Sequence, residues 1–223
     1  MTVQAHLRRL RDDVHAVAID DDAVFLDVAR DTYACVPGAA KMLVLDEARR
    51  VRAVADAAFT EVLDAAGLLA PPEARLSGQA WPVVRPGASA MTGPFAPPRW
   101  PDALEGARSL LDLSRCYYRQ PLSRLLDWAE AGATEAGSDP MDAATADLVA
   151  AFHRWSPYLP APGKCLLRSF TLLRLLRRHG QDARWVFGVR TWPFRAHCWL
   201  QRGDTVLDDD VEALVALTPI HVA

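Results

Sequence analysis

The stretch PGKCLLRSFTLLRLLRRHG, residues 162–180, decides how the C-terminal half of the chain is interpreted. Its Pro-Gly pair predicts a turn. Cys165 then opens an apolar run with helical spacing, and Gly180 is positioned to end that helix. Leucines cover most of the helix circumference, so we expect a central, buried helix. A helix N-terminus stabilises a thiolate, and Cys165 is therefore a candidate nucleophile.

Two further candidates for thiol chemistry follow downstream. His197 begins a predicted strand, HCWLQ (197–201), and an acid cluster ends the next one, TVLDDD (205–210). The RGD between the two strands predicts a short hairpin turn. A thiolate, an imidazole and a carboxylate are the parts of a cysteine hydrolase or acyltransferase. Strand alternation places Asp209 on one face and Asp208 on the other, and spacing alone does not choose between them.

The same residues have a structural interpretation that the sequence leaves open. A buried cysteine can be a small core residue, and three aspartates at a strand end can form a solvated turn. Cys198 alternates with His197 and is expected to be buried, while Trp199 is expected beside the active site. His153 and Trp155 are candidates to line its cleft. The arginines of the central helix could bind an acidic substrate, but they are attributed to its dipole and to solvation; they are Arg168, Arg174, Arg177 and Arg178.

Composition limits the classes of protein to consider. The chain has 223 residues, of which 51% are hydrophobic and 24% charged, as in a globular protein with one large or two small domains. Its net charge of −3 gives no reason to expect a nucleic-acid partner. We expect a cytoplasmic protein with four reduced cysteines, no signal peptide and no membrane span. Without a Cys-x-x-Cys pair, no metal site is expected.

The chain divides into three segments. Residues 1–70 contain three short β-rich runs at 14–19, 23–28 and 32–36, which predict an antiparallel meander. Helices are expected at 39–48 and 52–69, giving an α+β unit of winged-helix size. Eight of the 16 prolines fall in residues 71–101, which predicts an extended connector.

Residues 102–223 form the second predicted domain. Helices are expected at 102–133, with a break near Pro121, and at 141–156, followed by the helix that Cys165 opens. Strands are expected at 183–190, 197–201 and 205–210. Helices followed by a small sheet complete an α+β chain.

The segment from Cys165 to Asp210 resembles the B proteins of lasso-peptide biosynthesis, which are leader peptidases. The resemblance rests on Cys165-Leu166-Leu167-Arg168-Ser169, Gly188-Val189-Arg190, Pro193-Phe194-Arg195-Ala196-His197-Cys198-Trp199 and Val206-Leu207-Asp208-Asp209. It implies a transglutaminase-like, papain-related cysteine peptidase with Cys165 as nucleophile, His197 as base and Asp209 as the third member. Many relatives have Asn at the place of Asp208.

The N-terminal unit resembles the leader-recognition domains of such pathways, similar to the PQQ-biosynthesis chaperone. The resemblance lies in AVFLDVARDTYACVPG (23–38), with its Leu-Asp-x-x-x-Asp-x-Tyr pattern. It implies that a leader peptide adds a strand to the third strand, where backbone groups supply affinity and pockets supply selectivity. The expected leader-binding residues are Thr32, Tyr33, Ala34, Cys35 and Val36 on the strand, and Val54, Ala58, Thr60 and Leu63 on the last helix.

Together these resemblances predict a peptidase that binds a lasso-peptide precursor by its leader and hydrolyses the leader–core bond. No cofactor is expected, and any use of ATP is assigned to a separate lasso cyclase partner. The alternatives are an acyltransferase of transglutaminase type with the same triad, and a leader-binding scaffold without catalysis. The backbone N–H of Cys165 is the expected oxyanion donor, and a second donor is not assigned.

Overall fold

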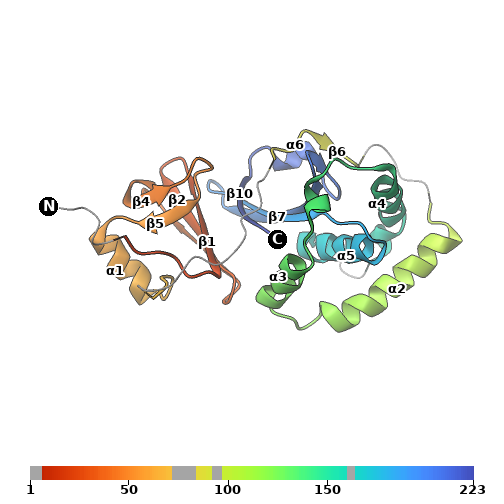
Figure 1. Cartoon of the computed structure of the whole chain (residues 1–223), viewed down its shortest axis with the longest axis horizontal. Helices are drawn as coiled ribbons and strands as arrows, with labels where there is room; N and C mark the ends of the chain where they lie inside the picture. Colours follow the sequence, from red (N-terminus) through yellow and green to blue (C-terminus); the bar gives the residue numbers. More distant parts are fainter. Residues whose placement is uncertain (1–6, 72–83, 92–96, 160–163) are drawn as a thin grey trace.

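The fold is α+β. In the described residues, a three-stranded N-terminal sheet packs beside a five-stranded C-terminal sheet, a two-stranded hairpin accompanies the first, and most helices lie on the second (Figure 1). The structure is a computed structural model that describes residues 7–71, 84–91, 97–159 and 164–223. The predicted Pro-Gly turn at 162–163, most of the predicted connector and the first six residues lie outside the described residues. Among the described helices, none is long and apolar enough to cross a bilayer.

The N-terminal sheet is the predicted antiparallel meander, in the order β1-β2-β3. Its strands match the prediction to within one residue at each end: β1 (Val14–Ile19), β2 (Asp22–Asp27) and β3 (Thr32–Val36). Asp20 and Asp31 form the two turns with positive φ, a conformation that aspartate tolerates better than most residues. β3 is an edge strand of this sheet.

The predicted helix at 39–48 is wrong. After a single 3₁₀ turn, the chain forms a second hairpin of β4 (Leu43–Leu45) and β5 (Val51–Val54). The apolar and β-branched residues on both sides of the turn favour pairing, and the Asp46 carboxylate closes the turn by accepting from the Arg50 N–H at 2.9 Å. The helix predicted at 52–69 is correspondingly shorter, α1 (Ala57–Ala65), because the Asp56 side chain caps it.

Within residues 84–91 and 164–223, the C-terminal sheet has five strands in the order β10-β7-β8-β9-β6. The strands are β6 (Ala88–Ser89), β7 (Arg184–Arg190), β8 (Arg195–Arg202), β9 (Thr205–Val206) and β10 (Thr218–Val222). β6 comes from the proline-rich segment predicted as a connector, and it pairs parallel to β9 as a two-residue edge strand. Prolines exclude a central strand but permit such an edge. The sequence interpretation assigned no structure to the residues of β10.

In the part of the chain that the structure describes, four α-helices cover the inner face of this sheet or pack on one another, and a short fifth lies on the outer face. They are α2 (Trp100–Cys116), α3 (Leu122–Ala131), α4 (Ala143–Trp155), α5 (Cys165–Arg178) and α6 (Val211–Leu214). The predicted break at Pro121 is confirmed, since this residue caps the start of α3. The predicted start of the central helix at Cys165 is also confirmed.

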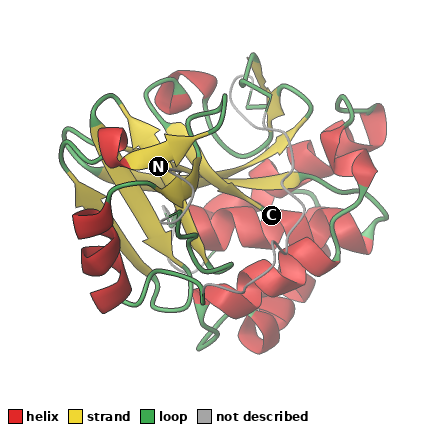
Figure 2. Cartoon of the chain, turned by 60° about the vertical axis from the view of Figure 1, so that its left-hand side comes forward, coloured by secondary structure: helices red, strands yellow, loops and turns green. Residues whose placement is uncertain are grey.

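One core joins the two parts of the chain. On one face of the N-terminal sheet, Val17, Val24 and Leu26 belong to the same buried cluster as the leucines of α5 and the apolar residues of β7. The opposite face, with Ala16 and Phe25, packs on α1 and the second hairpin. The N-terminal sheet is therefore buried on both faces, between α1 and the C-terminal part (Figures 1 and 2).

Candidate active site

The packing of α5 against β8 brings the three predicted residues together. Cys165 is the first residue of α5, His197 lies on β8, and Asp209 follows the short strand β9. The His197 Nε2 and Asp209 Oδ2 atoms are 2.5 Å apart. Because Nε2 faces the carboxylate, Nδ1 is the nitrogen left to exchange a proton with the thiol.

The pKa shifts of Cys165 and His197 favour an ion pair between their side chains. The pKa of Cys165 is lowered to about 4 by the thiol of Cys198, the His197 imidazole and the Cys198 backbone N–H, against the opposing effect of burial. The pKa of His197 is raised to about 9, first by Asp209 and then by Cys165. Between these two values a thiolate faces an imidazolium, which is the resting form of an activated cysteine nucleophile.

Asp209 is held from several directions. Its Oδ2 also accepts from Arg168 Nη2 at 2.8 Å, and its Oδ1 accepts from the Asp210 N–H at 2.8 Å. The Ser89 hydroxyl of β6 donates to its backbone carbonyl at 2.7 Å. Burial alone would raise the pKa of Asp209, but the hydrogen bonds from His197 and Asp210 and the charge of Arg168 lower it. Asp209 thus stays ionised and fixed beside the imidazole.

Asp208 has a different role. It is completely buried, and its carboxylate accepts from the Leu200 N–H at 2.8 Å and from the Ser169 hydroxyl at 2.5 Å. Burial raises its pKa to about 6, opposed by Arg168 and Ser169. The strand predicted at 205–210 is wrong beyond Val206, since β9 is only Thr205–Val206, so strand alternation does not apply to the two aspartates. Their contacts distinguish them instead: Asp209 contacts His197, and Asp208 ties α5 to β8.

The attribution of four arginines to solvation is wrong, although Arg177 and Arg178 do lie in the last turn of α5, where the helix dipole favours cations. Each pairs with a carboxylate: Arg168 with Asp209, Arg174 with Asp112, Arg177 with Asp182, and Arg178 with Glu105. A sequence signal for a role of Arg168 near the candidate nucleophile is its position three residues after Cys165, on the same face of the helix. Cys198 is buried as expected, but its contact with the Cys165 thiol was not foreseen.

Two residues proposed for the cleft lie in the interior instead. His153 and Trp155 are each only 4% exposed, because α4 packs them against the core. His153 Nε2 donates to the Leu207 carbonyl at 2.7 Å. This bond supports the chain immediately before the two aspartates. Within the described residues, no group of three or more His, Cys, Asp or Glu side chains is arranged to hold a metal ion.

The predicted leader-binding residues do not form a single surface. Thr32 and Ala34 of the β3 edge are exposed, whereas Tyr33 and Cys35 alternate towards the C-terminal part. The Tyr33 ring lies 5.9 Å from that of Phe194, on the turn that leads to His197. The β3 edge is therefore close to the strand that carries the candidate base.

The prediction of leader-binding residues on α1, the last helix of the N-terminal unit, is partly wrong. Val54 lies on β5 rather than on α1, and it is fully buried. Leu63 of α1 is 3% exposed and packs in the same core cluster as Val54. Both are core residues because they cover the apolar face of the N-terminal sheet, which leaves Ala58 exposed and Thr60 half-buried on the helix.

Comparison with known proteins agrees with this geometry. The transglutaminase-like superfamily matches residues 108–222, more than half of the chain. The chain therefore belongs to the transglutaminase-like superfamily, whose members are generally cysteine peptidases and transglutaminases.

One curated relative is the microcin J25-processing protein McjB of Escherichia coli. It is 44% identical over 45 residues, which are 20% of this chain and 22% of that protein. The match thus spans about a fifth of the length of the relative. No solved structure matches the chain significantly.

Proposed function

We propose that this protein is a cysteine peptidase that removes the leader from a lasso-peptide precursor. The observation that carries the proposal is the Cys165–His197–Asp209 arrangement, with opposite pKa shifts on its thiol and imidazole. Membership of the transglutaminase-like superfamily supports thiol-based acyl chemistry. The similarity to a microcin-processing protein supports a precursor peptide as substrate.

In the proposed reaction, the Cys165 thiolate attacks the carbonyl carbon of the leader–core bond. The oxyanion is placed at the N-terminus of α5, where the Cys165 N–H and the helix dipole favour negative charge. The C–N bond breaks as His197 gives its proton to the leaving amine of the core peptide. His197 then takes a proton from water, which attacks the thioester and releases the leader as a free acid. Asp209 fixes the imidazole throughout.

The N-terminal unit is proposed to hold the leader, as in the recognition domains related to the PQQ-biosynthesis chaperone. The supporting feature is the β3 edge, whose backbone groups are open to an added strand. Binding at this edge would raise the local concentration of the scissile bond at Cys165. We propose a cytoplasmic enzyme without a cofactor of its own, and we assign ATP-dependent ring closure to a separate cyclase partner.

The test uses a lasso-peptide precursor from the organism that produces this protein, with mass spectrometry as the readout. Wild-type protein is expected to cut at one site and release a free leader acid, whereas the Cys165→Ala protein binds the precursor without cutting it. Cleavage by Cys165→Ala, or binding by wild type with no cleavage even with the cyclase and ATP present, would contradict the proposal.

The superfamily match also favours a second candidate, acyl transfer by the same triad to an amine. Mass spectrometry separates the two reactions. A free leader acid indicates hydrolysis, while an adduct that retains the leader acyl group and loses water relative to its two parts indicates transfer.

A further inference from the structure

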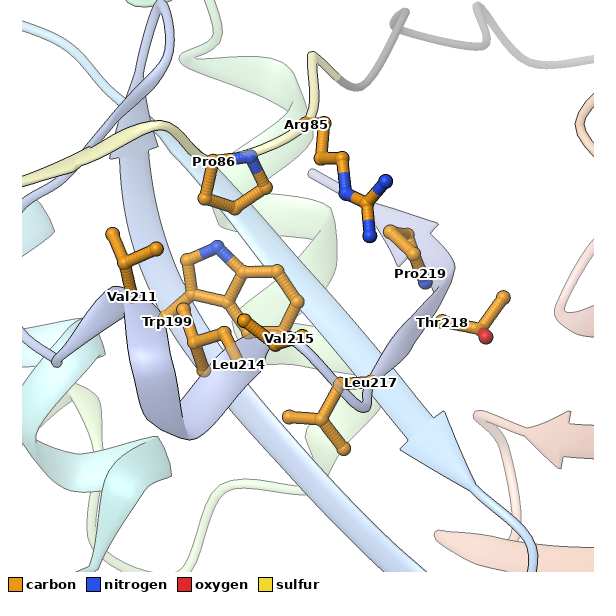
Figure 3. A pocket seen from close by; sticks show the side chains of 9 residues that line it. All are labelled: Arg85, Pro86, Trp199, Val211, Leu214, Val215, Leu217, Thr218 and Pro219. Carbon is orange, nitrogen blue, oxygen red and sulfur yellow. The ribbon is translucent and has the colours of Figure 1, made fainter.

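A pocket of about 320 Å³ lies on the outer face of the C-terminal sheet (Figure 3). Trp199 of β8 forms its floor, Leu214 of α6 and the adjacent Val215 form one side, and Pro86 lies opposite them. Trp199 and Leu214 belong to a core cluster that is separate from the one containing α5. The pocket is thus on the side of the sheet that the helices α2–α5 leave uncovered.

The pocket and the candidate base share strand β8. Trp199 and His197 are two positions apart on β8, so both side chains project from the same face of the strand, about 7 Å apart along it. Val211, another wall residue, follows Asp209 by two positions. An extended peptide also advances about 3.3 Å per residue. A substrate with its scissile carbonyl at Cys165 can therefore reach the pocket with a side chain about two residues away.

The lining indicates what the pocket accepts. Its walls are mostly apolar, and Val215 is 66% exposed although it is a large hydrophobic side chain. Arg85 lies at the rim with an exposed guanidinium (Figure 3), and no ion pair is found for it with the described residues. The volume is at the low end for ligand sites, which suits one bulky side chain rather than a whole cofactor.

We propose that this pocket is a substrate subsite that receives a bulky apolar side chain within two residues of the scissile bond. Arg85 pairs with a carboxylate on the neighbouring residue of the same peptide. The inference rests on the proposed peptidase function and adds a sequence preference to it. Apolar burial supplies the affinity, and the exposed ion pair adds a smaller, salt-dependent selectivity.

The test measures binding to full-length Cys165→Ala protein, so that it does not depend on turnover. The probes are the capped dipeptides acetyl-Leu-Asp-amide, acetyl-Gly-Asp-amide and acetyl-Leu-Asn-amide, followed by the indole N–H resonance of Trp199. A Trp199→Phe protein assigns that resonance, and the indole of Trp192, which is 75% exposed and outside the pocket, is the internal reference.

The leucine–aspartate probe is expected to shift the Trp199 resonance saturably, with the glycine probe at least tenfold weaker and the asparagine probe about threefold weaker. Val215→Asp should weaken the first probe at least tenfold. Val62→Asp is the matched control, because Val62 is similarly exposed, at 60%, on α1. No shift at Trp199, equal shifts by the glycine probe, or equal losses in both valine variants would overturn the subsite.

Failure of the subsite and failure of the peptidase proposal are distinguishable. If the probes bind as expected but wild-type protein never cuts the precursor, the pocket is a peptide-binding site and hydrolysis alone is refuted. If the precursor is cut at one site while the probes fail to bind, the peptidase stands and the subsite is refuted.

Discussion

Asp208 and Asp209 are adjacent in sequence but differ in what surrounds them. Asp209 is partly exposed and contacts His197 and Arg168, whereas Asp208 is fully buried and its pKa is raised to about 6. A carboxyl whose pKa rises on folding binds more protons in the native state between pH 3.8 and about 6. Stability is therefore lost as the pH rises through this window.

The first prediction separates the two aspartates. Asp208→Asn should leave kcat unchanged and raise the free energy of unfolding at pH 8 by up to roughly 3 kcal/mol, since a shift of one pKa unit is worth about 1.4 kcal/mol. This gain in the free energy of unfolding should shrink towards pH 4. Asp209→Asn should instead lower kcat by about 10²-fold. Denaturant unfolding at several pH values and cleavage kinetics check both variants. The opposite assignment of effects would show that Asp208, and not Asp209, is the carboxylate that supports His197.

The second prediction concerns Cys198, whose thiol makes the largest contribution to lowering the pKa of Cys165. Iodoacetamide reacts with the thiolate, so the alkylation rate of Cys165 should reach half of its plateau near pH 4 in wild-type protein. Cys198→Ala should move this midpoint up by a unit or more. Cys198→Ser, which keeps a hydroxyl donor, should move it less, and His197→Ala should also raise it. Identical midpoints in all four proteins would exclude this stabilisation.

At this scale, the order of the residues and their predicted elements were sufficient to bring forward Cys165, His197 and the acid cluster at 208–210 as candidates. The resemblance to the lasso-peptide B proteins was needed to choose Asp209 from that cluster. The sequence was not sufficient to predict the contact of Arg168 with Asp209 or that of Cys198 with Cys165. An arginine on a helix and a cysteine on a strand have ordinary explanations until the angle between α5 and β8 is known. That angle depends on core packing, which no local pattern encodes.

At the scale of elements, the short apolar run LVL (43–45) shows where sequence patterns are ambiguous. A run of this length fits either a helix turn or a strand, and the following VRAV (51–54) could be included in a helix for the same reason. Pairing of β4 with β5 decides in favour of strands, and pairing is a tertiary property. The long central helix was predictable because its apolar residues extend over several turns.

The third prediction concerns Gly188 on β7, opposite His197 on β8. A Cβ at this position would lie 2.7 Å from Trp199 Cζ3 and 3.3 Å from the Leu217 side chain. Gly188→Ala should therefore displace Trp199 and destabilise the protein by about 1–3 kcal/mol. Gly87→Ala is the control, since its Cβ would meet only the flexible Asp204 side chain at 3.3 Å. Equal melting temperatures for the two variants would show that the sheet accommodates the methyl group.

At the scale of the whole molecule, the two predicted units share a buried interface. The strands of the N-terminal sheet are recognisable from their alternation, but the sequence does not show that both faces of that sheet are covered. The His15 and His221 rings meet at this interface with centroids 3.9 Å apart, and His221 Nε2 lies 3.1 Å from Glu130 Oε1. Trp192 Nε1 also donates to Asp22 at 2.8 Å across it.

The fourth prediction is a loss of stability in acid that originates at this interface. The pKa of His15 is lowered to about 3 by burial and by His221, against the opposing charge of Asp13. Between about 3 and 6.5 the unfolded chain binds a proton at this residue that the native protein does not, so stability falls as the pH falls below 6.5. The slope from one such group is at most about 1.4 kcal/mol per pH unit.

His15→Phe removes this titration while keeping an aromatic ring against His221. Below pH 6.5 its free energy of unfolding should therefore fall less steeply than that of wild type, by up to about 1.4 kcal/mol per pH unit. His179→Phe is the control, because it alters an exposed histidine at the end of α5. Denaturant unfolding between pH 4.5 and 7.5 measures the three slopes. If wild type and His15→Phe lose stability in parallel, the two halves of the molecule are not coupled through the histidine pair. A flatter slope in His15→Phe alone would show that the N-terminal sheet contributes to the stability of the unit that carries Cys165.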